Sequence, residues 1–217
     1  MTNIKLFVIA LTILVLGFAG AVLWNSSRVE QQAGNLPRAD RTLLERMHSP
    51  SLGPREAKVV VTEFIDPACE TCAAFYPLVK GLMARHPDQI RLIVRFLPLH
   101  SGSDQVAVML EATRRQNKLW QVLELVLANQ KEWAINHHAD PAIVFPMLVH
   151  LGLDQAKLKE DMNSNSVADV IMQDMADARR LGVEKTPGYF VNGRPLEPFG
   201  YKPLEALIES ELKANYP

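Results

Sequence analysis

The chain has 217 residues, of which 22% are charged and 48% are hydrophobic, and only 2 are cysteines. This length and composition suffice for one buried core, and they exclude a small domain held together by disulfides. The 23 Lys and Arg residues nearly balance the 24 Asp and Glu residues, and no basic run could neutralise a series of phosphates. Nucleic acid is therefore not predicted as a partner.

Residues 1–24 differ in character from the rest of the chain. Lys5 is their only charged residue, and the apolar run from Leu6 to Trp24 is interrupted only by Thr12. As a helix this run covers roughly 28 Å, close to the hydrocarbon thickness of a bilayer, which favours a membrane anchor. A cleaved signal peptide is the alternative, because Ala19-Gly20-Ala21 fits a small-residue cleavage site. In both cases the chain after residue 24 is exported. An anchor predicts a single-pass inner-membrane protein with a periplasmic domain, and a cleaved signal peptide predicts a soluble periplasmic protein.

Residues 25–54 are polar and contain several glycines and prolines, which predicts a spacer with one short helical candidate at 41–48. The folded domain is therefore expected at 55–217. Its first element is the run KVVVTEFI at 58–65, which is rich in β-branched residues and too continuously apolar for a sheet with one solvated face. A central strand covered on both faces is predicted.

The next segments complete a strand, helix and strand unit. Apolar residues recur at helical spacing over 69–85, a stretch that ends before Pro87, and IRLIVRFL at 90–97 reads as a second strand. A unit of this length predicts two parallel strands with a right-handed crossover.

A long helical stretch then precedes the last elements. No strand pattern occurs between 103 and 181, where helices are predicted at 103–117, 119–130, 140–151, 154–162 and 167–181. Asn192-Gly193 between two short apolar runs predicts a hairpin with a two-residue turn. A closing helix is expected from about Pro203.

The two cysteines lie in the motif Cys69-Glu70-Thr71-Cys72, where the first strand feeds the first helix. Unpaired backbone amides and the helix dipole favour a thiolate at Cys69, whereas Cys72 lies one turn further in and is covered. A purely structural bridge would close so small a ring that it stabilises little. A metal site would need more ligands, and the histidines at 100, 137 and 138 complete no tetrahedral set. Redox cycling is the favoured interpretation.

The strand at 58–65, the CETC motif, the inserted helices and Lys185-Thr186-Pro187 before the hairpin together resemble the thioredoxin superfamily. The long insertion makes the chain similar to the DsbA-like thiol:disulfide oxidoreductases, over about 55–217. This resemblance implies an α/β thioredoxin-like fold with a helical subdomain at about 103–181, and no bound cofactor.

The resemblance also implies roles for individual residues. Cys69 is the attacking thiol, Cys72 the resolving thiol, and Pro187 a cis-proline that faces the pair. Thr186 offers backbone contacts to a bound peptide.

Glu63 corresponds to a buried acid that relays protons to the resolving thiol in DsbA-like proteins. Burial in an apolar strand would raise the pKa of this carboxyl, which suits proton transfer. The alternative is a glutamate at a solvated strand end. Arg95 on the neighbouring strand is a candidate ion-pair partner for Glu63. The nearby aromatic residues Phe64, Phe75 and Tyr76 are expected in the core more than on a peptide-binding surface.

The two residues between the cysteines, Glu70 and Thr71, differ from those of DsbA. At this site DsbA carries a histidine, which stabilises the thiolate. A carboxylate at Glu70 disfavours a second negative charge beside it, and Thr71 supplies at most one hydrogen bond. We therefore expect a pair less oxidising than that of DsbA, which leaves oxidase, reductase and isomerase directions open.

The predicted function is that of an exported thiol:disulfide oxidoreductase acting on protein substrates. Without a third cysteine, electrons must pass through another protein, so a membrane redox partner is expected. The spacer is too short for a dimerisation domain, which favours a monomeric ectodomain. Two alternatives remain: a copper- or zinc-binding module that uses the Cys pair and a histidine, and a redox-inert adaptor.

Overall fold

The computed structural model describes residues 11, 13–21 and 38–216, which belong to two units, Met1–Pro37 and Arg38–Pro217. Residues 11 and 13–21 are helical and exposed. Most of the predicted anchor or signal segment at 1–24 lies outside the described residues, as does the spacer up to residue 37. Among the described residues, no helix combines the length and apolar character needed to cross a bilayer.

A five-stranded sheet forms the centre of the second unit, in the order β1-β3-β2-β6-β7. Its strands are β1 (Ser51–Leu52), β2 (Val59–Ile65), β3 (Ile90–Phe96), β6 (Gly188–Val191) and β7 (Arg194–Pro195). Strands β2 and β3 are parallel, as predicted, and the other pairings are antiparallel. Asn192 and Gly193 form the turn between β6 and β7, both with the positive φ that a two-residue turn of this kind requires.

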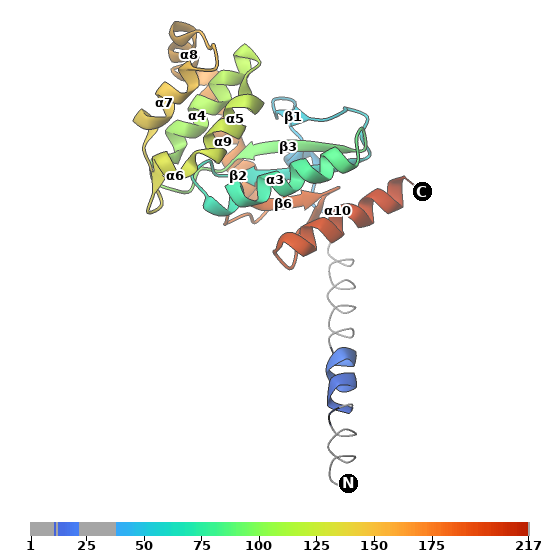
Figure 1. The fold of residues 1–217 in the computed structure, drawn as a ribbon. Helices are drawn as coiled ribbons and strands as arrows, with labels where there is room; N and C mark the ends of the chain where they lie inside the picture. The colour runs from blue at the N-terminus through green and yellow to red at the C-terminus, as the bar shows by residue number, and fades with distance from the viewer. Residues whose placement is uncertain (1–10, 12, 22–37, 217) are drawn as a thin grey trace. The chain divides into compact units, whose positions relative to one another are not determined.

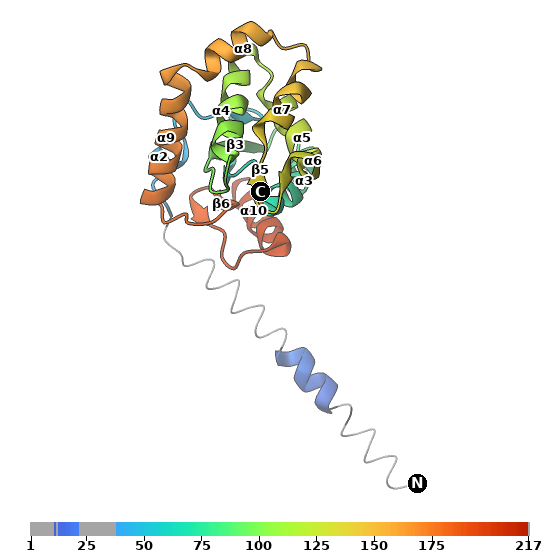
Figure 2. The ribbon, with the colours of Figure 1, turned by 90° about the vertical axis from the view of Figure 1, so that its left-hand side faces the viewer.

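Helices cover both faces of the sheet, which explains why every residue of β2 is buried. Helices α3 (Glu70–Arg85) and α10 (Tyr201–Asn215) lie on one face, and α2 (Arg41–Leu44) and α9 (Asn165–Arg180) lie on the other (Figure 2). Because side chains alternate along a strand, β2 contributes to a separate core on each side. Val61 and Ile65 pack with α3, whereas Phe64 packs with Leu44 and Ala178.

The insertion between β3 and β6 is mostly helical, as predicted, and its helices before α9 gather at one end of the sheet (Figure 1). It contains α4 (Ser103–Thr113), α5 (Leu119–Ala128), α6 (Gln130–Trp133), α7 (Pro141–Val149), α8 (Gln155–Met162) and α9. Asp140 caps α7 by accepting a hydrogen bond from the Ala142 amide at 2.9 Å. The sequence did not reveal a small hairpin of β4 (Ala134–Ile135) and β5 (His138–Ala139), because two-residue strands are too short to show alternation.

The compact unit begins at Arg38, which is earlier in the chain than the start expected at residue 55. Leu43 and Leu44 of α2 are buried, and the Ala39 amide donates to the Gly193 carbonyl at 2.7 Å. The Arg46 guanidinium lies 2.6 Å from the Asp177 carboxylate. The polar composition of this stretch concealed two buried leucines whose contacts lie far along the chain.

A buried ion cluster joins β3, α9 and α2. The Arg95 guanidinium is fully buried, with Nε 2.6 Å from Asp174 Oδ1 and Nη2 2.7 Å from Asp177 Oδ2. The predicted pairing of Arg95 with Glu63 is wrong, because Arg95 is in register with Phe64 and side chains alternate along β2. Burial opposes the charge on Asp177, yet Arg46 and Arg95 hold the pKa of its carboxyl at about 2.

Replacing Arg95 by methionine leaves two buried carboxylates without their shared cation, so we expect the free energy of unfolding to fall by about 3 kcal/mol. Urea denaturation at neutral pH measures this change. The control is Arg85→Met, which breaks an ion pair to Glu205 whose two side chains are 53% and 44% exposed. That variant should lose less than about 1 kcal/mol, and an equal loss in both variants would contradict the prediction.

Candidate functional site

The cysteine pair lies where β2 ends and α3 begins. Cys69 is the N-cap residue of α3, and Cys72 lies one turn into the helix, with both thiols free. Cys72 is fully covered, and Cys69 exposes only 5% of its surface. The carbonyl oxygen of Thr186 accepts a hydrogen bond from Cys69 Sγ at 3.3 Å.

The two thiols have opposite pKa shifts. A hydrogen bond from the Cys72 thiol, together with the Thr186 side chain and the Cys72 and Thr71 amides, lowers the pKa of Cys69 to about 6 against the effect of burial. Burial raises the pKa of Cys72 well above its usual value, and Cys69 and Glu63 add to this shift. The arrangement therefore favours a thiolate at Cys69 and a protonated thiol at Cys72.

Thr186 and Pro187 come to the cysteines from the other end of the chain. The Thr186–Pro187 peptide bond is cis. Strand β6 starts directly after it at Gly188, where a Cβ would lie 2.5 Å from Val183 Cγ1. A side chain at this position would have to displace the Val183 side chain, so glycine allows β6 and the segment before Thr186 to pack this closely.

Glu63 lies on the face of β2 that carries the cysteines, opposite Tyr189 of β6. It is fully buried, so the alternative of a solvated strand end is wrong. Neither carboxylate oxygen makes a hydrogen bond of regular geometry among the described residues, although the Tyr189 hydroxyl lies close enough to influence the carboxyl. Burial raises the pKa of Glu63 to about 8; the Tyr189 hydroxyl counters part of this shift, and a negative charge at Cys69 adds to it.

Sequence reasoning missed Asp66 and His100. No role was assigned to Asp66 from the sequence, and His100 was considered only as a possible metal ligand. In the structure the buried Asp66 carboxylate lies 2.7 Å from His100 Nδ1 and accepts hydrogen bonds from three backbone amides. The available signal in the sequence was an aspartate directly before a proline, at the end of a predicted strand and three residues before Cys69.

An aromatic stack lies beside the cysteines on α3. Phe64, Phe75 and Tyr76 are buried, as expected for core residues. The Phe75 ring, however, stacks on Tyr201 and Phe199 at centroid distances of 4.0 and 4.8 Å. Tyr201 and Phe199 are 47% and 52% exposed, so the stack connects the core under α3 to an apolar surface.

The metal-binding alternative has no support from the structure. Within the part of the chain that is described, no three His, Cys, Asp or Glu side chains gather to hold an ion. The ring of His137 stacks on that of His100, and His138 Nδ1 lies 3.1 Å from Ser101 Oγ.

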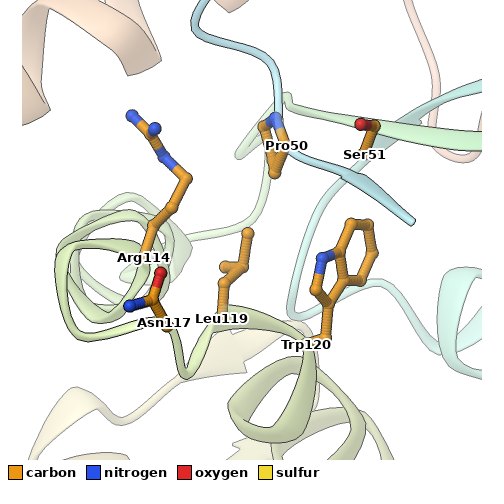
Figure 3. A pocket seen from close by; sticks show the side chains of 6 residues that line it. All are labelled: Pro50, Ser51, Arg114, Asn117, Leu119 and Trp120. Carbon is orange, nitrogen blue, oxygen red and sulfur yellow. The ribbon is translucent and has the colours of Figure 1, made fainter. Parts of the chain in front are cut away.

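Two surface pockets of about 320 and 310 Å³ contain neither cysteine. The first lies between β1 and the start of α5 (Figure 3) and is lined by Pro50, Ser51, Arg114, Asn117, Leu119 and Trp120. The second lies between α3 and α5, where the Lys80 ammonium pairs with the Glu124 carboxylate at 2.9 Å.

Comparisons with known proteins agree with this geometry. The family model described as "Thioredoxin" matches residues 45–210. A thioredoxin-like oxidoreductase from Silicibacter pomeroyi has a similar structure, with a TM-score of 0.70, 30% identity and coverage of 81% of this chain and 99% of that one. The probable disulfide bond formation protein D of Bacillus cereus is 28% identical over 75% of this chain and 78% of the relative. A Na⁺/H⁺ antiporter NhaA of Herminiimonas arsenicoxydans is 28% identical over 91% of this chain, which spans only 32% of the antiporter.

The pH dependence of stability provides a test of the Glu63 environment. The native carboxyl, with a pKa of about 8, stays protonated where the unfolded one, near 4.5, has ionised. The free energy of unfolding should therefore fall as pH rises between these values, by up to about 1.4 kcal/mol per pH unit. Glu63→Gln should remove this component and be more stable than the wild type above pH 8.

Denaturant titrations across that pH range, with the exposed Glu56→Gln as control, measure the difference. Parallel stability curves for the wild type and Glu63→Gln would contradict the assigned environment of Glu63.

Proposed function

Because the chain belongs to the thioredoxin family, whose model covers residues 45–210, we propose that it is a thiol:disulfide oxidoreductase acting on protein substrates. The family and the DsbA-like fold expected from the residues are confirmed by the family match and the structural neighbours. In this proposal Cys69 is the attacking thiol, Cys72 resolves the mixed disulfide, and Thr186 with Pro187 aligns the substrate chain.

One observation carries the proposal: Cys69 Sγ lies at the amino end of a 16-residue helix and 3.3 Å from the carbonyl of Thr186. The helix end stabilises a thiolate. The neighbouring backbone of Thr186 offers hydrogen-bonding groups to an extended peptide whose sulfur approaches Cys69. A nucleophile and a peptide-binding backbone at one point are the two requirements of disulfide exchange with a protein.

The exchange balances in both directions. In oxidation, a substrate thiolate attacks Cys69 of the Cys69–Cys72 disulfide, forming a mixed disulfide while Cys72 leaves as a thiolate and takes up a proton. A second substrate thiolate then attacks the substrate sulfur of the mixed disulfide, and Cys69 leaves as a thiolate. Two electrons pass from the substrate, which gains a disulfide, to the cysteine pair. Reduction is the reverse sequence.

Glu63 supplies the proton for the buried resolving thiol in this scheme. A carboxyl with a pKa of about 8 is mostly protonated near neutral pH, and its charge influences Cys72. Such an acid can donate a proton to Cys72 as it leaves and accept one when Cys72 attacks.

The exposed aromatic rings of Phe199 and Tyr201 give the substrate an apolar surface beside α3. Since the chain has 2 cysteines in total, electrons would leave or enter the pair through a separate redox partner, which we place at the membrane. The domain would act as a monomer outside the cytoplasm. The apolar run from Leu6 to Trp24 supports export, both as an anchor and as a signal segment.

The reduction potential should lie below about −120 mV, the value for DsbA. A pKa of about 6 at Cys69 means a less stabilised thiolate than the pKa of about 3.5 known for DsbA. Equilibration with glutathione buffers, followed by thiol alkylation, measures the potential. Glu70→His should raise it, and a wild-type potential at or above that of DsbA would contradict the argument.

Trapping of the mixed disulfide tests the assigned roles. Cys72→Ser should accumulate a covalent adduct with an unfolded substrate protein that contains one disulfide: attack by Cys69 releases one substrate sulfur as a thiolate, and the chain then has no second thiol to resolve the mixed disulfide. Non-reducing electrophoresis and mass spectrometry should locate the bond at Cys69. The matched variant Cys69→Ser should form no adduct, and an adduct through Cys72 in that variant would refute the assignment.

A further inference from the structure

Asp66, directly after β2, is fully buried and has an unusually complete set of hydrogen bonds. Its two carboxylate oxygens accept four: Oδ1 from the Ala68 amide at 2.8 Å, and Oδ2 from the Leu99 amide at 2.6 Å, the His100 amide at 2.8 Å and His100 Nδ1 at 2.7 Å. Four donors around one buried carboxylate offset the cost of removing its charge from water.

These hydrogen bonds join two loops that are distant in sequence. Oδ1 fixes the turn directly before Cys69, and the carbonyl of Asp66 also accepts from the Cys69 amide at 3.0 Å. Oδ2 fixes the loop after β3, at Leu99 and His100. One side chain therefore determines how the residues that carry the nucleophile lie against the neighbouring loop.

The helical insertion contacts the same two loops. Gln130 of α6 donates to the Pro67 carbonyl at 2.8 Å. The His137 ring stacks on His100 at a centroid distance of 5.4 Å, and the Ala139 amide donates to the Ser101 carbonyl at 2.8 Å. The loop held by Asp66 is thus fixed from its other side as well, which makes it a rigid support for the turn.

We propose that Asp66 is a positioning residue for disulfide exchange, whose carboxylate holds the Asp66–Cys69 turn so that Cys69 Sγ meets the amides of Thr71 and Cys72. The inference rests on the proposed function, in which Cys69 is the nucleophile. The reason for a dedicated group is geometric, because a nucleophile displaced by about 1 Å can lose on the order of a hundredfold in rate.

The direction in which the pKa of Cys69 changes in Asp66→Asn distinguishes a positioning role from a purely electrostatic one. A negative charge close to a thiol disfavours the thiolate, so if Asp66 acted by its charge alone, Asp66→Asn would lower the pKa of Cys69. If Asp66 acts by position, the same change loosens the turn and weakens the amide hydrogen bonds to the thiolate. The pKa of Cys69 should then rise from its value of about 6.

The experiment compares Asp66→Asn with the wild type and with Asp161→Asn. Asp161 is also buried, but it lies in α8 and pairs with Arg115 at 2.7 Å, so this control loses stability without touching the turn. Thiolate absorbance against pH and the rate of iodoacetamide reaction are measured in the folded reduced proteins. Asp66→Asn should raise the pKa and slow alkylation several-fold near pH 6, whereas Asp161→Asn should match the wild type.

A second pair of variants covers the case in which Asp66→Asn does not fold. His100 is partly exposed; His100→Ala removes one of the four donors, and His100→Asn keeps an N–H donor near the position of Nδ1. The pKa should rise in the alanine variant and return toward the wild-type value in the asparagine variant. An unchanged or lowered pKa in Asp66→Asn, or equal behaviour of the two His100 variants, would overturn the inference.

The thiolate pKa is independent of any substrate protein. Failure of the wild type to exchange disulfides would therefore refute the proposed function without deciding the role of Asp66.

Discussion

Strand β2 is the constraint on which both faces of the domain depend, because all seven of its residues are buried in the middle of the sheet. Side chains alternate along it, so Glu63 and Phe64 are adjacent in sequence but belong to different cores. The Glu63 face receives α3 with its cysteines, and the Phe64 face receives the ion cluster around Arg95. A shift of one residue in register would exchange these environments and destroy both.

The buried acids of this protein are stabilised in two different ways. Asp66, Asp174 and Asp177 each meet several donors or cations, so their charges contribute to a fixed geometry. Glu63 is equally buried but meets no such partner among the described residues. Its ionisation is therefore costly, which raises the pKa of its carboxyl to about 8, and a pKa close to neutral pH is what proton transfer to a neighbour requires. The lack of partners suits Glu63 to proton transfer, and the abundance of partners suits Asp66 to positioning.

The sequence predicted those helices, strands and turns whose pattern of apolar or turn-forming residues lies within the element itself. The apolar run of β2, the spacing of the inserted helices and the Asn192-Gly193 turn gave the right structure, and the CETC motif gave its place at a helix start. The failures involve partners that are distant in the chain. The pairing of Arg95 with Glu63 is wrong because the sequence does not give the register of the two strands, which decides the face of the sheet on which each side chain lies. The roles of Asp66 and of Leu44 depend on contacts with other segments, which no local pattern contains.

The position of α2 has a consequence for the order in which the chain is synthesised. Arg46 bonds to Asp177, 131 residues later, and Leu44 packs against Ala178, so the partners of α2 are made long after α2 itself. Until α9 has been made, Leu44 lacks its contact with Ala178, and Arg95 lacks the carboxylates of Asp174 and Asp177. The sheet face opposite the cysteines therefore closes late, and a nascent chain exposes that face throughout the synthesis of the helical insertion.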